Sequence, residues 1–182
     1  MKFIPSDLPG VMLITPDVFS DERGAFWEVH HQEKFAENGI SYQFIQDNQS
    51  TSRRMVLRGL HYQLVKPQGK LVRVLQGKVF DVAVDLRRSS PYFGKWMGCI
   101  LSGRNRQQLW IPPGFAHGFY TLSNWARVSY KTTELYSSQT DRTLLWNDAS
   151  VAVDWPLIDG RLPMLSVKDA NGVPLEKAEV FE

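Results

Sequence analysis

One histidine interrupts a strand-like stretch of the chain, and it is the first side chain that suggests chemistry. In VLRGLHYQ, residues 56–63, strand alternation puts His61 and Gln63 on one face and Leu60 and Tyr62 on the other. An imidazole in this position can bind a metal ion, act as a general base, or pack in the core. Taken by itself, a lone histidine on a strand is more often structural than functional.

A second histidine follows a rigid turn. In LWIPPGFAHGFYTLS, residues 109–123, a Pro-Pro-Gly turn leads into a strand that begins near His117. Phe119 and Thr121 share the face of this histidine. Such a residue can line a pocket or cap the turn, and this segment alone leaves both interpretations open.

The residues around these histidines argue against a metal site. A histidine-based metal site in a jelly roll presents His-x-His, a later Glu and a further His. The corresponding residues here are His61, Gln63, Lys70 and His117. A protonated lysine has no lone pair and repels a divalent cation, and an amide is a weaker ligand than an imidazole. The sequence therefore predicts no bound metal.

Tyr130 completes a set of groups that suits acid–base chemistry. In ARVSYKTTELY it shares a strand face with Tyr136. A cavity into which His61, Lys70, His117 and Tyr130 point would hold a base, a cation and a phenol. The base would remove a proton next to a carbonyl, the cation would stabilise the enolate, and the phenol would return a proton. Each residue alone has an ordinary structural explanation, and their combination is more informative.

Composition narrows the class of protein and of partner. The chain has 182 residues, 43% hydrophobic and 22% charged, so we expect a single domain over residues 1–182. A net charge of +2 indicates no broad field for nucleic acid or a membrane. Cys99 is the only cysteine, which excludes a disulfide framework within the chain. No segment is long and apolar enough to span a bilayer, and we expect a cytoplasmic protein.

The elements that must position these side chains are short strands. β-prone runs separated by Gly, Pro, Asn and Asp follow one another from GVMLITP to RTLLWND. This pattern predicts an all-β fold, an antiparallel sandwich or jelly roll. In VFDVAVDL, alternation puts four apolar side chains on one face, those of Phe80, Val82, Val84 and Leu86.

A few features fall outside this strand pattern. QEKFAENGI is the best candidate for a helix, and we expect it to end at Gly39. From about Val151 the pattern loosens into Pro-containing turns and a tail that we expect to pack over the barrel. Asp81 and Asp85 could buttress the site, but a structural or surface role is the favoured interpretation.

Several motifs occur in order along the chain, from about Gly10 to Asp169: DERGAFWEVH, QDNQS, LRGLHYQ, PQGKLVRVLQGKVFDVAVDLR, FGKWMG, QLWIPPGFAHGF, YKTTELY, LWND and LSVKDA. Together they closely resemble the dTDP-4-dehydrorhamnose 3,5-epimerases. The resemblance implies a cupin-type antiparallel jelly roll with a few short helices, acting as a homodimer without metal or organic cofactor. The implied substrate is dTDP-4-dehydro-6-deoxy-D-glucose. Its carbons 3 and 5, both α to the C4 ketone, are epimerised in making the dTDP-L-rhamnose precursor.

The resemblance also implies a role for individual residues. His61 matches the general base, Asp169 the carboxylate that orients it, Tyr130 the general acid, and Lys70 the residue that steadies the enolate oxygen. Further matches to substrate-binding positions are Arg23, Glu28, Gln46, Asp47, Asn48, Arg58, His117 and Lys168. A diphosphate needs cations, and the arginines and the lysine of this set can supply them.

The sequence departs from the family pattern in two places and raises one difficulty. Asp141 stands where the family usually has Glu, so its contact with substrate would be made by a shorter side chain. The loop between Gln63 and Lys70 is one residue shorter than in some members. Strict alternation puts Arg58 on the face opposite His61, so either Gly59 allows a bulge or Arg58 acts at another edge, across subunits for example.

Three other functions remain open. The same chemistry serves an epimerase that acts only at C3 or a ketoisomerase on a related dTDP-4-keto-6-deoxyhexose, although Tyr130 favours reaction at both carbons. A non-catalytic module that binds nucleotide sugars would not need both His61 and Tyr130. A metal-dependent cupin oxygenase is disfavoured by Gln63 and Lys70.

Overall fold

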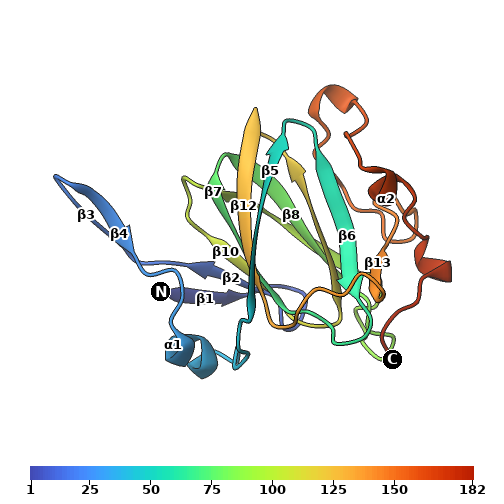
Figure 1. The fold of residues 1–182 in the computed structure, drawn as a ribbon, viewed down its shortest axis with the longest axis horizontal. Coiled ribbons are helices and arrows are strands. Elements are labelled where there is room, and N and C mark those ends of the chain that lie inside the picture. Colours follow the sequence, from blue (N-terminus) through green and yellow to red (C-terminus); the bar gives the residue numbers. More distant parts are fainter.

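Two antiparallel sheets face each other in the computed structural model, which describes residues 1–182 (Figure 1). The larger sheet has the strand order β1 (Lys2–Pro5), β2 (Met12–Thr15), β10 (Gln108–Ile111), β7 (Lys70–Gln76), β12 (Trp125–Thr132) and β5 (Gln46–Arg53). The smaller sheet has the order β13 (Asp141–Thr143), β6 (Leu57–Gln63), β11 (Phe115–Thr121), β8 (Lys78–Asp85) and β9 (Trp96–Ser102). Neighbouring strands that are distant in sequence are the mark of a jelly roll, and the predicted all-β jelly roll is confirmed.

Few residues lie in helices. They are α1 (Gln32–Glu37), α2 (Val167–Ala170) and two short 3₁₀ turns, Ile158–Gly160 and Leu175–Lys177. As predicted, the first helix ends before Gly39, whose φ of +82° suits a residue without a side chain. No helix is long and apolar enough to cross a membrane.

The main core lies between the two sheets and follows the alternation of the strands. Val72 and Val74 of β7 pack with Val128 of β12 and with Phe119 of β11 from the facing sheet. The predicted apolar face of β8 is also confirmed, and it points the other way, since Val82 packs in a second core on the outer side of the smaller sheet. Consequently the opposite face of β8, with Val79 and Ala83, points into the space between the two sheets.

The C-terminal segment covers the outer side of the smaller sheet, as predicted (Figure 1). Trp146, Val151 and Trp155 are buried there against the strands, together with Ala178 near the end of the chain. Apolar burial of this kind contributes roughly 25 cal/mol per Å² and holds an otherwise irregular segment in place. The segment carries α2 to the barrel wall beside β6.

A bulge in β6 resolves the difficulty with Arg58. His117 pairs with His61 and Phe119 pairs with Arg58, so β6 advances three residues while β11 advances two. Gly59 has a φ of +134°, and a Cβ there would lie 2.5 Å from the Cα of Gly118. The bulge therefore needs two glycines in contact, and it turns Arg58 and His61 to the same side of the strand.

One hairpin projects from the body of the molecule, formed by β3 (Val18–Asp21) and β4 (Gly24–Trp27) (Figure 1). Its strands pair only with each other. Phe19 and Phe26 are 67% and 71% exposed, which is unusual for phenylalanine side chains that face each other across two strands.

Candidate active site

Two cavities that share part of their lining lie between the sheets. The outer one, of about 250 Å³, is bordered by β5, β6, β7, β12, β13 and α2, and the inner one has a volume of about 150 Å³. His61, Lys70 and Tyr130 line both cavities, so these three side chains meet where the two spaces join. They come from three strands of both sheets, β6, β7 and β12. The predicted convergence of base, cation and phenol is what the structure shows.

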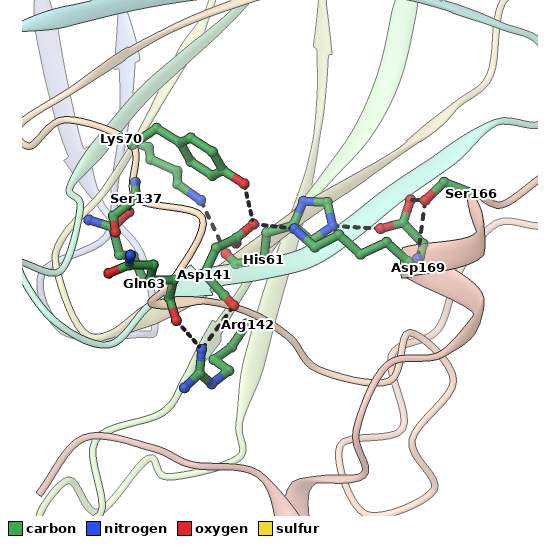
Figure 2. Close-up of polar contacts among 11 residues, drawn as sticks. His61, Gln63, Lys70, Ser137, Asp141, Arg142, Ser166 and Asp169 are labelled. Carbon is green, nitrogen blue, oxygen red and sulfur yellow. Dashed lines mark hydrogen bonds and ion pairs between the residues drawn. The ribbon is translucent and has the colours of Figure 1, made fainter.

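His61 and Asp169 form a hydrogen-bonded pair at the wall of the cavity (Figure 2). The distance from His61 Nε2 to Asp169 Oδ1 is 2.5 Å, and Asp169 is only 3% exposed. On the other side of the carboxylate, the hydroxyl of Ser166 donates to Oδ2 at 2.8 Å. The same hydroxyl accepts the backbone N–H of Asp169 and so caps the first turn of α2.

The pKa values of this pair indicate a charged carboxylate beside a neutral imidazole. Burial would raise the pKa of Asp169, but hydrogen bonds with His61 and Ser166 outweigh it, and the pKa lies below its ordinary value. Burial lowers the pKa of His61, and the attraction of Asp169 offsets this only in part. At neutral pH the carboxylate is therefore charged and the imidazole neutral. Nε2–H donates to Asp169, which leaves the lone pair of Nδ1 to accept a proton.

Lys70 places an ammonium group beside this base. The side chain is 7% exposed, and Nζ donates to the backbone carbonyl of His61 at 3.1 Å. Burial lowers the pKa of Lys70 to about 8, against the attraction of Asp141 and Asp81. A cation in this position can bind a developing oxyanion. No three His, Cys, Asp or Glu side chains are grouped so that they could hold a metal ion.

Tyr130 faces His61 from the opposite sheet. It lies on β12 between Asn48 of β5 and Val72 of β7, whereas His61 lies on β6 of the smaller sheet. Burial raises the pKa of Tyr130, so the phenol keeps its proton at neutral pH. A planar group held between the sheets would thus have the imidazole on one side and the phenol on the other.

His117 lines the inner cavity and pairs with a buried carboxylate. Its Nε2 lies 3.0 Å from Oδ1 of Asp81, which is fully buried. A surface role for Asp81 is therefore wrong, and the residue buttresses the site. Asp85 is also buried and accepts hydrogen bonds from Arg87 and Ser90, which is the structural role expected for it.

Other predicted residues complete the two cavities. Arg58 lines the inner one, where Nε donates to the hydroxyl of Ser52 at 2.9 Å. Gln46 and Asn48 line the outer one and are joined by a hydrogen bond of 2.9 Å. Lys168 of α2 also lines the outer cavity. The structure thus brings a guanidinium and an ammonium to opposite ends of the same space.

The rim of the outer cavity contains a residue that sequence reasoning left without a role. The hydroxyl of Tyr136 donates to Oδ2 of Asp141 at 3.0 Å, and Lys168 forms an ion pair with the same oxygen. Tyr136 follows Tyr130 by an even number of residues and shares its strand face in the sequence, which was the available signal. Gln68 lines the same cavity and also had no assigned role. The shorter side chain of Asp141 still reaches the site.

Three predicted binding residues do not reach these cavities within one chain. Asp47 points to the outer face of β5 and pairs with Lys131, because neighbours on a strand alternate. Arg23 lies at the tip of the projecting hairpin and pairs only with Asp21, and Glu28 follows the hairpin and pairs with Lys34. These positions stay predictions as substrate contacts.

Comparisons with known proteins found one matching family model, several relatives and several similar structures. The family model described as dTDP-4-dehydrorhamnose 3,5-epimerase matches residues 5–177. A dTDP-4-dehydrorhamnose 3,5-epimerase from Pseudomonas aeruginosa is 50% identical over 182 residues, which cover 100% of this chain and 99% of that protein. The crystal structure of a 3,5-epimerase from Legionella pneumophila with dTDP-4-keto-L-rhamnose has a TM-score of 0.94 at 47% identity, covering 98% of this chain and 94% of that chain. A 3′-monoepimerase from Streptomyces bikiniensis, in complex with dTDP-quinovose, has a TM-score of 0.87 at 27% identity, covering 95% of this chain and 87% of that chain.

Proposed function

The chain belongs to the dTDP-4-dehydrorhamnose 3,5-epimerase family, and we propose that its own residues epimerise dTDP-4-dehydro-6-deoxy-D-glucose at C3 and C5. It is an isomerase of dTDP-L-rhamnose biosynthesis. The observation that carries the proposed mechanism is the placing of His61, with Asp169, and of Tyr130 on opposite sheets around one cavity. Epimerisation removes a proton from one face of a carbon and returns one to the other face, so it needs an acid–base group on each side.

Each of the two epimerisations begins with proton abstraction by His61. Nδ1 takes the proton from the carbon next to the C4 ketone, the C–H electrons form a C=C bond, and the carbonyl electrons move onto the oxygen. The ammonium of Lys70, held next to His61, stabilises that enolate oxygen. Asp169 stabilises the imidazolium that forms. Tyr130 then donates its proton to the opposite face of the carbon, and solvent restores both groups.

The nucleotide diphosphate would lie along the polar lining of the two cavities. Lys168 of the outer cavity or Arg58 of the inner one supplies positive charge for its phosphate oxygens, and Gln46 and Asn48 supply amide donors and acceptors. We assign His117, buttressed by Asp81, to the floor of the sugar site. No organic cofactor or metal takes part in this scheme.

We further propose a homodimer in which the β3–β4 hairpin of one chain completes the site of its partner. Apart from Trp27 at its base, which packs against Arg106, the hairpin is exposed, Phe19 and Phe26 included, and it carries Arg23 away from the chain's own cavities. Exposed aromatic side chains next to an arginine are typical of a surface that binds another protein chain. We assign the enzyme to the cytoplasm, where its single free thiol, Cys99, stays reduced.

Deuterium exchange tests the function directly. The protein is incubated with the 4-keto sugar nucleotide in D₂O, and C3 and C5 are followed by NMR. Deuterium at both carbons is expected, and its absence from both would contradict the proposal. Deuterium at C3 alone would instead indicate a monoepimerase like the Streptomyces relative. Exhaustive chelation before the assay should leave the rate unchanged.

A further inference from the structure

Gln63 lies two residues after the base, but its side chain does not line either cavity. It is 4% exposed, and all its hydrogen bonds go to backbone groups of two loops. Nε2 donates to the carbonyls of Lys66 at 2.8 Å and Leu135 at 3.2 Å. Oε1 accepts the N–H of Ser137 at 2.8 Å (Figure 2). The amide thus joins the β6–β7 loop to the β12–β13 loop.

Two other glutamines hold the same stretch of the β12–β13 loop. Oε1 of Gln46 accepts the N–H of Tyr136 at 2.9 Å, and Nε2 of Gln68 donates to the carbonyl of Glu134 at 2.9 Å. Together with Gln63, these amides therefore bind four successive residues, 134–137. Only the amide of Gln63 holds two of the four residues and is itself buried.

This loop has little apolar packing to fix its position. Leu135 and Tyr136 are both exposed, so burial of side chains does not hold them. An exposed loop without such packing keeps several conformations open, and ordering it has a cost in conformational entropy. Hydrogen bonds to the three glutamine amides, and one from the hydroxyl of Thr132 to the carbonyl of Glu134, favour one conformation here.

The conformation of the loop decides where the rim of the outer cavity lies. Tyr136 lines that cavity, and its hydroxyl binds Asp141, which in turn pairs with Lys168. If the loop moved, Tyr136 would leave Asp141, and the rim would lose one of its three side chains. His61 and Lys70 would keep their positions, because His61 is held by Asp169 and Lys70 binds a backbone carbonyl of β6.

We propose that Gln63 is a positioning residue, which fixes residues 134–137 so that Tyr136 and Asp141 form the substrate-binding rim. It acts on the affinity for the sugar nucleotide and leaves proton transfer largely unchanged. The inference rests on the proposed function of the cavity. It assigns a role to Gln63, which in the sequence served only as an argument against a metal site.

The test replaces the amide by an apolar side chain of similar length, Gln63→Met. The matched control is Gln139→Met, the same change at an exposed residue of the same loop whose side chain makes no hydrogen bond. We expect KM to rise roughly tenfold and kcat to stay within about twofold for Gln63→Met, since all three hydrogen bonds of the amide are lost and part of that loss is felt at the rim. Binding of dTDP, measured by calorimetry, should weaken by a similar factor. Gln139→Met should change neither constant.

A double-mutant cycle separates positioning of Tyr136 from a general loss of structure. In a Tyr136→Ala background, Gln63→Met should raise KM much less than it does in the native chain. An equal rise in both backgrounds, a fall in kcat alone, or no change in KM would each overturn the inference. If Gln63→Met does not fold, Gln63→Glu takes its place, since it keeps the acceptor for Ser137 and loses both donors. Deuterium exchange in the unmodified enzyme tests the proposed function independently.

Discussion

The cavity between the sheets and the β3–β4 hairpin are built in opposite ways. In the cavity, His61 is held by the buried Asp169, which Ser166 holds in turn, and Lys70 is held by a backbone carbonyl. In the hairpin, every residue from Val18 to Phe26 is exposed, and the side chain of Arg23 is 86% exposed with Asp21 as its single partner. An isolated two-stranded hairpin is at best marginally stable in water.

The difference separates two tasks of the enzyme. Proton transfer needs groups held within a fraction of an ångström, and the chain supplies that rigidity from its own core. The hairpin has no such support, so it can contribute only after it packs on another surface. We therefore expect changes at the reacting side chains of the cavity to reduce kcat and changes in the hairpin to raise KM.

The largest effect is expected from the base. His61→Ala removes the proton acceptor and should lower deuterium exchange at both C3 and C5 by about 10³-fold or more. NMR in D₂O measures this, and the thermal midpoint of unfolding serves as the control for folding. Substantial exchange in this variant would mean that another group removes the proton, and the cavity would lose its assigned role.

The second largest effect is expected from Tyr130→Phe. Loss of the phenolic proton should slow formation of the epimerised product by about 10²-fold, because a general acid contributes 10²–10⁴-fold. KM should change little, since only the hydroxyl is removed. Product analysis by NMR together with steady-state kinetics checks both points. A variant with unchanged product and rate would show that the donor on the larger sheet is a different group.

A smaller effect is expected from the hairpin. Arg23→Ala should raise KM roughly tenfold with kcat almost unchanged, since one charge-assisted contact to the substrate is lost. Loss of turnover at saturating substrate would break the distinction between cavity and hairpin.

Mixed dimers locate the site that Arg23 serves. A hybrid of His61→Ala and Arg23→Ala chains contains one native site if the hairpin reaches into the partner. At low substrate, the mixture should then exceed the summed activity of its parents. If Arg23 acts in its own chain, no native site forms and no such gain occurs.

The smallest effect is expected in the pH dependence of activity, which is also the most specific test of the cavity. The base must be neutral, so activity should rise with pH through the pKa of His61, which burial places below its ordinary value. Lys70 must be charged, so activity should fall as pH passes the Lys70 pKa of about 8. Lys70→Arg should remove that alkaline fall, because a guanidinium does not lose its proton in this range. If activity still fell at the same alkaline pH in Lys70→Arg, a group other than Lys70 would be responsible for the fall.

Much of the fold followed from local pattern, and much of the site did not. Alternation in VFDVAVDL correctly predicted which side of β8 is apolar, because side chains on a strand alternate whatever surrounds them. The same rule failed for Arg58, since contact between Gly59 and Gly118 inserts a bulge that only the pairing of β6 with β11 creates. It allowed Asp81 to buttress the site but did not name His117 as its partner.

The sequence by itself determined the chemical types present: an imidazole, an ammonium and a phenol on strands, with no ligand set for a metal. It also determined the family, through motifs that keep their order over nearly the whole chain. Only the tertiary structure decided which groups meet. His61 and Asp169 are 108 residues apart, and no local rule brings a short C-terminal helix to a strand of the barrel. That contact depends on burial of the C-terminal segment against the smaller sheet, which is a property of the whole fold.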